Sequence, residues 1–197
     1  MTRFYPPDAP VPARIAGDGF ILRPLTVAHT ALDYAAVMDS APLLRRWSSS
    51  EWPAAGFTLA DNRADLALHQ QEHEARVAFT YTILDPSEST CLGCVYIKPN
   101  IVAELGPRDD DALLRFWVRQ PLLGTGLDRR VLATARDLPA HGLAFGRVFF
   151  HANADDRHQQ RLFAGAGLHA RGRFAIPERH GIYIFYDAAA AERAGNA

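Results

Sequence analysis

The sequence has little cysteine and almost no net charge. Its 197 residues include two cysteines, and 21 Lys and Arg nearly balance 22 Asp and Glu, which leaves a formal charge of −1. A near-neutral chain argues against a general nucleic-acid binder, which is usually basic. No apolar run is long enough to span a membrane, and the first residues lack the apolar core of a signal peptide. We therefore expect a cytoplasmic protein that binds neither nucleic acid nor membrane.

The two cysteines, Cys91 and Cys94, have the CxxC spacing of metal and redox sites. Both fall in the apolar stretch 90–97 (TCLGCVYI), which is typical of a strand, where residues three apart point to opposite faces. No second CxxC or paired histidine cluster completes a zinc site. The pattern predicts two buried structural cysteines and no metal.

The length fits one domain with a full hydrophobic core. Four prolines predict an extended arm over 1–17, and the alanine-rich end predicts a loosely held tail over 188–197, so the domain should span 18–187. Periodicity and turn signals predict strands over 20–25, 77–84, 90–97, 111–120, 147–152, 168–176 and 181–186, and helices over 26–38, 40–47, 58–76, after 126 and after 155.

The stretch 111–138 organises the chain. A strand over 111–120, stopped by Pro121, leads into Gly124-Thr125-Gly126, and an amphipathic helix follows. A glycine turn at a helix N-terminus presents unpaired N–H groups and partial positive charge, and Arg129 adds a full charge. This predicts a phosphorylated ligand; the alternative is a plain tight turn. Neither the dinucleotide fingerprint nor the P-loop pattern fits the spacing.

The predicted helix 58–76 carries His69, Glu72 and His73, which spell HxxEH, the inverted zinc-protease motif. The two histidines share a helix face, as metal ligands would. The neighbouring Glu74 and Arg76 favour a solvated face or a substrate contact instead. A zinc-dependent hydrolase is therefore kept only as a remote alternative.

Two tryptophans, Trp47 and Trp52, flank Glu51 in a polar, loop-like segment. Aromatic and charged side chains on a loop suit the rim of a substrate site. The alternative is that both tryptophans pack onto the core.

Several local patterns follow one another in a familiar order: FILRPLTVAH, CLGCVYI, FWVRQPLLGTGL and DRHQQRLFAGAGL. Together, over about residues 18–187, they resemble the GCN5-related N-acetyltransferase (GNAT) superfamily, and most of all the branch that acts on ribosomal-protein N-termini. The resemblance implies an α/β (α+β) fold with a mixed, mostly antiparallel sheet of six to seven strands, about four helices, and splayed central strands.

The resemblance also implies acetyl-CoA as cosubstrate, with its pantetheine arm between the strands 111–120 and 147–152. Val118 would offer its backbone to that arm. The residues carried over to the phosphate loop are Leu123, Gly124, Thr125, Gly126, Leu127 and Asp128, with Arg129 beside them, and those on the late helix are Asp156 and Gln159.

Three positions depart from the family pattern. Leu123 stands where the loop usually has Gln or Arg, Asp128 where it has a small residue, and Phe163 where many relatives keep a tyrosine as general acid. These departures support a second hypothesis, a non-catalytic GNAT-like binding module that has lost CoA binding.

The implied reaction moves an acetyl or other short acyl group to a primary amine by direct attack in a ternary complex. The acceptor is expected to be a small-molecule amine or a protein N-terminus, entering over Trp47 and Trp52, with Glu51 pairing a cationic amine. For the catalytic proton transfer we expect His151 first, because its pKa suits neutral pH, and then Asp111 and Tyr96. The oligomeric state is open, with a homodimer as one option.

Overall fold

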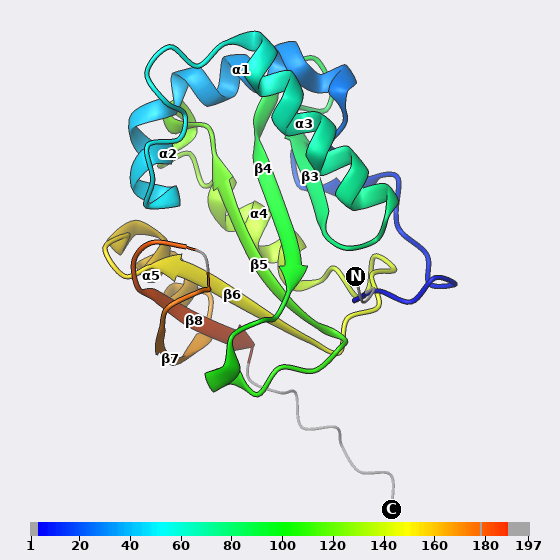
Figure 1. Cartoon of the computed structure of the whole chain (residues 1–197), viewed down its shortest axis with the longest axis vertical. Helices are drawn as coiled ribbons and strands as arrows, with labels where there is room; N and C mark the ends of the chain where they lie inside the picture. Colours follow the sequence, from blue (N-terminus) through cyan, green and yellow to red (C-terminus); the bar gives the residue numbers. More distant parts are fainter. Residues whose placement is uncertain (1–3, 178, 189–197) are drawn as a thin grey trace, which may run out of the picture.

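The structure is a computed structural model that describes residues 4–177 and 179–188. Its core is one eight-stranded sheet in the order β1-β2-β3-β4-β5-β6-β8-β7, accompanied by five α-helices in that part of the chain (Figure 1). Only β5 and β6 pair in parallel, so the expected mixed, mostly antiparallel sheet is confirmed. The sheet has one strand more than expected.

The elements follow the predicted order closely. The strands are β1 (Ile15–Gly17), β2 (Phe20–Pro24), β3 (Phe79–Leu84), β4 (Cys91–Pro99), β5 (Asp111–Val118), β6 (Arg147–Asn153), β7 (Leu168–Phe174) and β8 (Tyr183–Ala188). The helices are α1 (Thr30–Asp39), α2 (Ala41–Ser48), α3 (Leu59–Glu74), α4 (Leu127–Arg136) and α5 (Arg157–Gly165). The extra strand, β1, falls within the stretch expected to be an arm. The expected tail lies outside the described residues beyond Ala188.

Helices cover both faces of the sheet. Leu114, Phe116 and Val118 of β5 point to one face, where they join the core formed with α4 and α5. The intervening Trp117 points to the other face and packs with residues of α1, α2 and α3. This alternation confirms the predicted strand and places β5 at the centre of both layers. In Figure 1, α4 lies behind the sheet and α1 and α3 lie along its upper part.

The N-terminal segment packs into the core instead of lying free. Phe4 and Tyr5 are buried, and the Tyr5 ring meets Phe79 and Phe145 at centroid distances of 4.9 and 5.2 Å. The Tyr5 hydroxyl donates to the carbonyl of Pro10 at 2.8 Å. Aromatic contacts of this kind add to the free energy of burial.

The prediction that Cys91 and Cys94 point to opposite faces is wrong. The β3–β4 register shifts between Ile83 and Leu84, opposite a bulge that includes Gly93. The extra residue brings both cysteines to the α1 side, where the Cys94 thiol donates to Asp33 at 3.4 Å. Both cysteines are free and fully buried, as predicted. Among the described helices, none is long and apolar enough to cross a membrane.

Candidate functional site: a splayed strand pair and its two flanking cavities

β5 and β6 pair over only the first half of their lengths. Their parallel register covers four residue pairs and ends at Leu114 opposite Phe150. Beyond that point β5 continues to Val118 and β6 to Asn153 without pairing to each other, and Figure 1 shows the two strands diverging. The splay leaves backbone groups of β5 facing an opening in the sheet.

The glycine turn forms directly after β5. Gly124 and Gly126 adopt φ values of 84° and 80°, which other residues rarely adopt. Gly126 is the N-cap of α4, and no side chain caps this helix. The first-turn amides of an α-helix have no intrahelical acceptor, and the helix dipole adds positive potential there. The turn therefore offers an oxyanion a set of N–H donors at the end of the splay.

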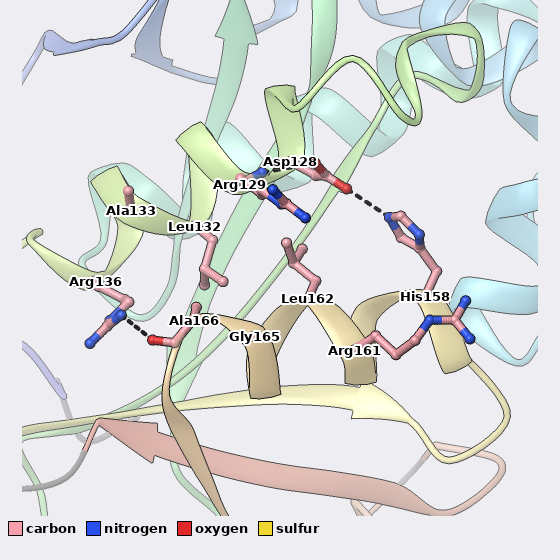
Figure 2. A pocket seen from close by; sticks show the side chains of 10 residues that line it. All are labelled: Asp128, Arg129, Leu132, Ala133, Arg136, His158, Arg161, Leu162, Gly165 and Ala166. Carbon is pink, nitrogen blue, oxygen red and sulfur yellow. Dashed lines mark hydrogen bonds and ion pairs between the residues drawn. The ribbon is translucent and has the colours of Figure 1, made fainter.

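Asp128, in the first turn of α4, has hydrogen-bond partners on both α4 and α5. Its carboxylate lies 2.7 Å from Nε2 of His158 on α5, as Figure 2 shows, and it also accepts from the amide of Arg129 at 2.8 Å. The side chain is almost fully buried. One oxygen of Asp128 thus occupies a first-turn amide of α4, and the other is directed toward an imidazole of the neighbouring helix.

A groove of about 570 Å³ runs between α4 and α5. Arg129 from α4 and Arg161 from α5 line it on facing sides (Figure 2). Arg136 closes its far end by donating to the carbonyl of Ala166 at 2.6 Å. Guanidinium groups are the preferred partners of phosphate oxygens, so this groove extends the anion site beyond the glycine turn.

Two side chains occupy the mouth of the splay. The main-chain carbonyl of Phe116 accepts from Nε1 of Trp47 at 3.0 Å and from Nε2 of Gln159 at 2.7 Å. The cavity left there is small, about 40 Å³. A ligand that reaches this carbonyl has to displace at least one of these donors.

The other residues expected at the cofactor lie around this mouth. Val118 is buried and pairs with Gly93 of β4. Asp156 is the N-cap of α5 and accepts from the amide of Gln159 at 3.0 Å. Leu123 and Asp156 also line a wider cavity of about 670 Å³ that opens between α2 and α5. Asp156 and Gln159 thus already have partners within the fold.

A separate cavity of about 260 Å³ lies on the α1–α3 side of the sheet. Its walls include Trp47, Trp52, Tyr96 and His69. The Trp52 indole donates to Asp65 at 3.1 Å. Trp47 is buried, so it belongs to the core as well as to the cavity wall. Glu51 is exposed and lines none of the described cavities.

Tyr96 presents a protonated hydroxyl to this cavity. Burial, followed by the nearby Cys94 and Asp33, raises the pKa of Tyr96 well above its usual value. Its oxygen accepts from Nε1 of Trp117 at 3.3 Å, which leaves its own hydrogen free to be donated. The ring also meets His69 at a centroid distance of 5.6 Å.

His151 lies just beyond the last β5–β6 pair, on the strand facing Arg115 across the opening. Its ring packs against Tyr183 and Phe185, and its Nδ1 has no hydrogen-bond partner among the described residues. Burial, with the positive charges of Arg115 and Arg179, lowers the pKa of His151 well below its usual value. The imidazole is therefore neutral at physiological pH.

Asp111 lies at the opposite, closed end of β5. It is fully buried and forms an ion pair with Arg147, whose Nε donates at 2.7 Å. The amide of Arg108 donates to it at 2.8 Å. Burial by itself raises the pKa of Asp111, but these hydrogen bonds outweigh it and lower the pKa. This arrangement fixes the start of β5 and is remote from the splay.

The zinc hypothesis lacks a ligand set. In residues 4–177 and 179–188, only Asp33, Cys91 and Cys94 bring three potential ligand atoms together, and all three are buried. His69 and His73 are not part of any such group. His73 packs its ring edge-on against aromatic residues of β3.

Sequence reasoning missed Arg115. Its place on a predicted strand gave no sign that it would be buried, or that it would stack on Trp47 with its guanidinium carbon 3.3 Å from the ring centre. The contact joins residues 68 positions apart, so only the tertiary structure reveals it.

No protein-family model matches the sequence, and no curated protein matches it. Solved structures do match. The ribosomal L7/L12 alpha-N-protein acetyltransferase RimL in complex with coenzyme A superposes with a TM-score of 0.71 at 13% identity, covering 88% of this chain and 96% of that one. The microcin C7 self-immunity acetyltransferase MccE, with acetyl-CoA and AMP, gives 0.71 at 13% identity over 89% and 96%. Mycobacterium smegmatis RimJ, with a CoA disulfide, gives 0.70 at 13% identity over 89% and 84%.

These likenesses, together with the splayed parallel pair and the glycine turn before α4, show that the chain has an acetyltransferase fold. More particularly, it is the fold of the GCN5-related N-acetyltransferases, and the structural neighbours include enzymes named for ribosomal proteins, one of them described as modifying an N-terminal serine. The resemblance inferred from the sequence is confirmed at the level of the fold.

Proposed function

We propose that this protein transfers an acetyl, or other short acyl, group from acyl-CoA to a primary amine by direct attack in a ternary complex. The observation that carries the proposal is the end of β5–β6 pairing at Leu114 and Phe150. An anion-binding turn and a cationic groove lie beyond this opening, and a separate cavity lies on the other face. Two reactants bound from the two faces would meet at the opening.

The chain's own residues fit the phosphate end of CoA. The amides of the glycine turn and the guanidinium groups of Arg129 and Arg161 would hold its phosphates, and Val118 would present backbone groups to the pantetheine arm. CoA-bound neighbours of the same fold support acetyl-CoA as the cosubstrate. When bound, acetyl-CoA supplies the acyl group as a thioester.

The proposed reaction gives two side chains a role in proton transfer. As the amine nitrogen bonds to the acyl carbon and the carbon–sulfur bond breaks, the amine loses one proton and the sulfur gains one. His151 has an unpartnered Nδ1 beside the opening, but its lowered pKa makes it a weaker base than the sequence led us to expect, so it would take the amine proton only in passing, on its way through water to solvent. Tyr96 stays protonated and can donate to the departing sulfur, a role that Phe163 cannot fill. Asp111 has no role in this scheme.

The acceptor would occupy the cavity lined by Trp47, Trp52 and Tyr96. A small-molecule amine or the N-terminus of a protein fits this position. Neighbours of the same fold are named for ribosomal proteins, one of them described as modifying an N-terminal serine, which supports the second kind of acceptor.

Binding and turnover of acetyl-CoA test the proposal. At 100 times its Kd, acetyl-CoA should stabilise the fold by about 2.7 kcal/mol, which raises the Tm by roughly 5–10 °C. Replacing both Arg129 and Arg161 with Ala should weaken binding roughly tenfold or more. The matched control is Arg63→Ala, since Arg63 is exposed on α3 far from the groove. Release of CoA thiol with a panel of amines then measures transfer.

One observation favours the second candidate, a binding module without catalysis: Trp47 and Gln159 occupy the Phe116 carbonyl. In that case acetyl-CoA, succinyl-CoA and free CoA would all leave the Tm unchanged. A Tm rise that depends on Arg129 and Arg161 contradicts this candidate.

A further inference from the structure

Arg115 is a buried cation without an anionic partner. Its side chain lies on β5 and the residue is 4% exposed. Nη2 donates to the carbonyl of Trp47 at 2.5 Å, whereas Nε and Nη1 have no hydrogen-bond partner. None of the ion pairs found in the described residues includes Arg115. Buried charges in proteins are normally paired, because an unpaired one is costly to desolvate.

The guanidinium group is held in a fixed position. It stacks on the Trp47 indole at 3.3 Å and lies 5.9 Å from the Tyr183 ring. Burial lowers the pKa of Arg115 to about 9, so the group is still charged at neutral pH. Two rigid, unused donors on a charged group are what an oxyanion requires.

Arg115 forms part of the wall of the 260 Å³ cavity, with these two donors buried directly behind that wall, and the wall carries further positive charge. Arg179 lines the same cavity and is close enough to Arg115 to lower its pKa. Lys98 also lines it and lies 3.6 Å from Glu72 on α3. The lining thus carries three cationic side chains, Lys98, Arg115 and Arg179, against two carboxylates, Asp33 and Asp65.

The carboxylates of the cavity wall are already engaged elsewhere. Asp65 accepts from the Trp52 indole at 3.1 Å. Asp33 accepts from Asn62 at 3.0 Å and from Cys94 at 3.4 Å, and its burial raises its pKa. Neither forms an ion pair with Arg115.

We propose that Arg115 binds a carboxylate of the acceptor, so that the amine this protein modifies belongs to an anionic molecule. The inference rests on the proposed transferase function and names its substrate class. Arg115 is the first residue of β5 beyond the paired segment and precedes Phe116, whose carbonyl faces the splay. A carboxylate held there keeps an amine of the same molecule close to the opening, where Tyr96 also lies.

The carboxylate has two sources, the α-carboxylate of a free amino acid or an acidic first residue of a peptide. Matched pairs distinguish them: alanine against alaninamide, and amidated tripeptides beginning with Glu against Gln. The measurement is kcat/KM from thiol release with acetyl-CoA. In one of the pairs the acid should exceed its amide by roughly tenfold or more, as expected for a lost charge-assisted hydrogen bond.

The variant Arg115→Met should abolish that preference by bringing the ratio of kcat/KM for the acid to that for the amide down to about one. The Tm rise with acetyl-CoA should be unchanged, because Arg115 faces away from the phosphate groove. Arg63→Met, on an exposed part of α3, should keep the preference. If Arg115→Met fails to fold, Arg115→Gln serves instead. Equal rates for acid and amide in the wild type, or a preference that survives Arg115→Met, would overturn the inference.

Failure of the proposed function would look different. If acetyl-CoA neither binds nor turns over, calorimetric titration with the same four compounds still measures the site directly. Binding of one acid but not its amide, lost in Arg115→Met, then supports a carboxylate site in a protein that is not a transferase. Absence of any such binding overturns the carboxylate site as well.

Discussion

The indole nitrogen of Trp47, at the end of α2, donates a 3.0 Å hydrogen bond to the main-chain carbonyl of Phe116 on β5. Gln159 of α5 donates to the same oxygen from the opposite side of the splay. These two side chains thus form the hydrogen bonds to the Phe116 carbonyl that an amide of an entering ligand would otherwise form. The strand pair is open, but side chains from two helices form hydrogen bonds to β5 at the mouth of the opening.

Ligand binding should move Trp47. Acetyl-CoA is expected to change the intrinsic tryptophan fluorescence of the wild type, and Trp47→Phe should remove most of that change. The variant should also bind acetyl-CoA about fivefold more tightly, because one hydrogen bond worth about 1 kcal/mol no longer has to be broken. Trp52→Phe, which alters a tryptophan bonded to Asp65, should retain the signal. An unchanged signal in Trp47→Phe would show that the indole stays in place.

The Asp128–His158 pair should set the strength of CoA binding. His158→Ala leaves the Asp128 charge unpaired near the phosphate site, so the Kd for CoA should rise severalfold. Asp128→Asn removes the charge and should lower the Kd. The double variant should behave like Asp128→Asn alone, which a double-mutant cycle by calorimetry measures. Additive effects would show that His158 acts independently of Asp128.

Stability should fall in acid partly through His151. Its pKa in the folded protein lies well below 6.5, its value in an unfolded chain, so the unfolded state binds more protons below pH 6.5. The stabilising contribution is complete above pH 6.5 and is lost as pH falls toward the folded pKa. Denaturant titrations at pH 7.5 and 5.5 should show a smaller loss for His151→Asn than for the wild type. His29 and His73 shift in the same direction, so some pH dependence should persist in the variant.

The bulge at Gly93 should not tolerate a side chain. A Cβ there would lie 2.1 Å from the carbonyl oxygen of Trp117, and the φ of 148° disfavours other residues. Gly93→Ala should therefore lower the free energy of unfolding by roughly 2 kcal/mol or more. Gly165→Ala is the matched control, because a Cβ at Gly165 meets nothing within 4 Å. Equal stability of the two variants in urea would contradict the close approach.

Much of the fold could be predicted because its signals are local. The alternation of Leu114, Phe116 and Val118 defined β5, and the glycines after it defined the start of α4. Thr58 and Asp61 form the capping box that begins α3, with the Asp61 amide donating to the Thr58 hydroxyl at 3.2 Å. Each of these patterns depends on neighbours within a few residues.

The site was harder to predict because its contacts join distant segments. The stacking of Arg115 on Trp47 and the two donors on Phe116 depend on how α2 and α5 meet β5. The common face of Cys91 and Cys94 depends on one bulge, which a strand periodicity of two cannot anticipate. Whether Asp111 lies near the opening depends on which end of β5 separates from β6, and only the β5–β6 register shows this.

Phe4 and Tyr5 belong to the hydrophobic core, although they precede residues 18–187, the stretch that carries the family resemblance. Phe4 stacks on Phe145 at 5.7 Å, and the Tyr5 hydroxyl accepts from the amide of Ala144, so these two residues secure the chain between α4 and β6. A truncation starting at residue 18 would uncover Phe79 and Phe145 to water. Activity measured on such a truncated protein would then reflect the loss of core packing and not the chemistry of the site.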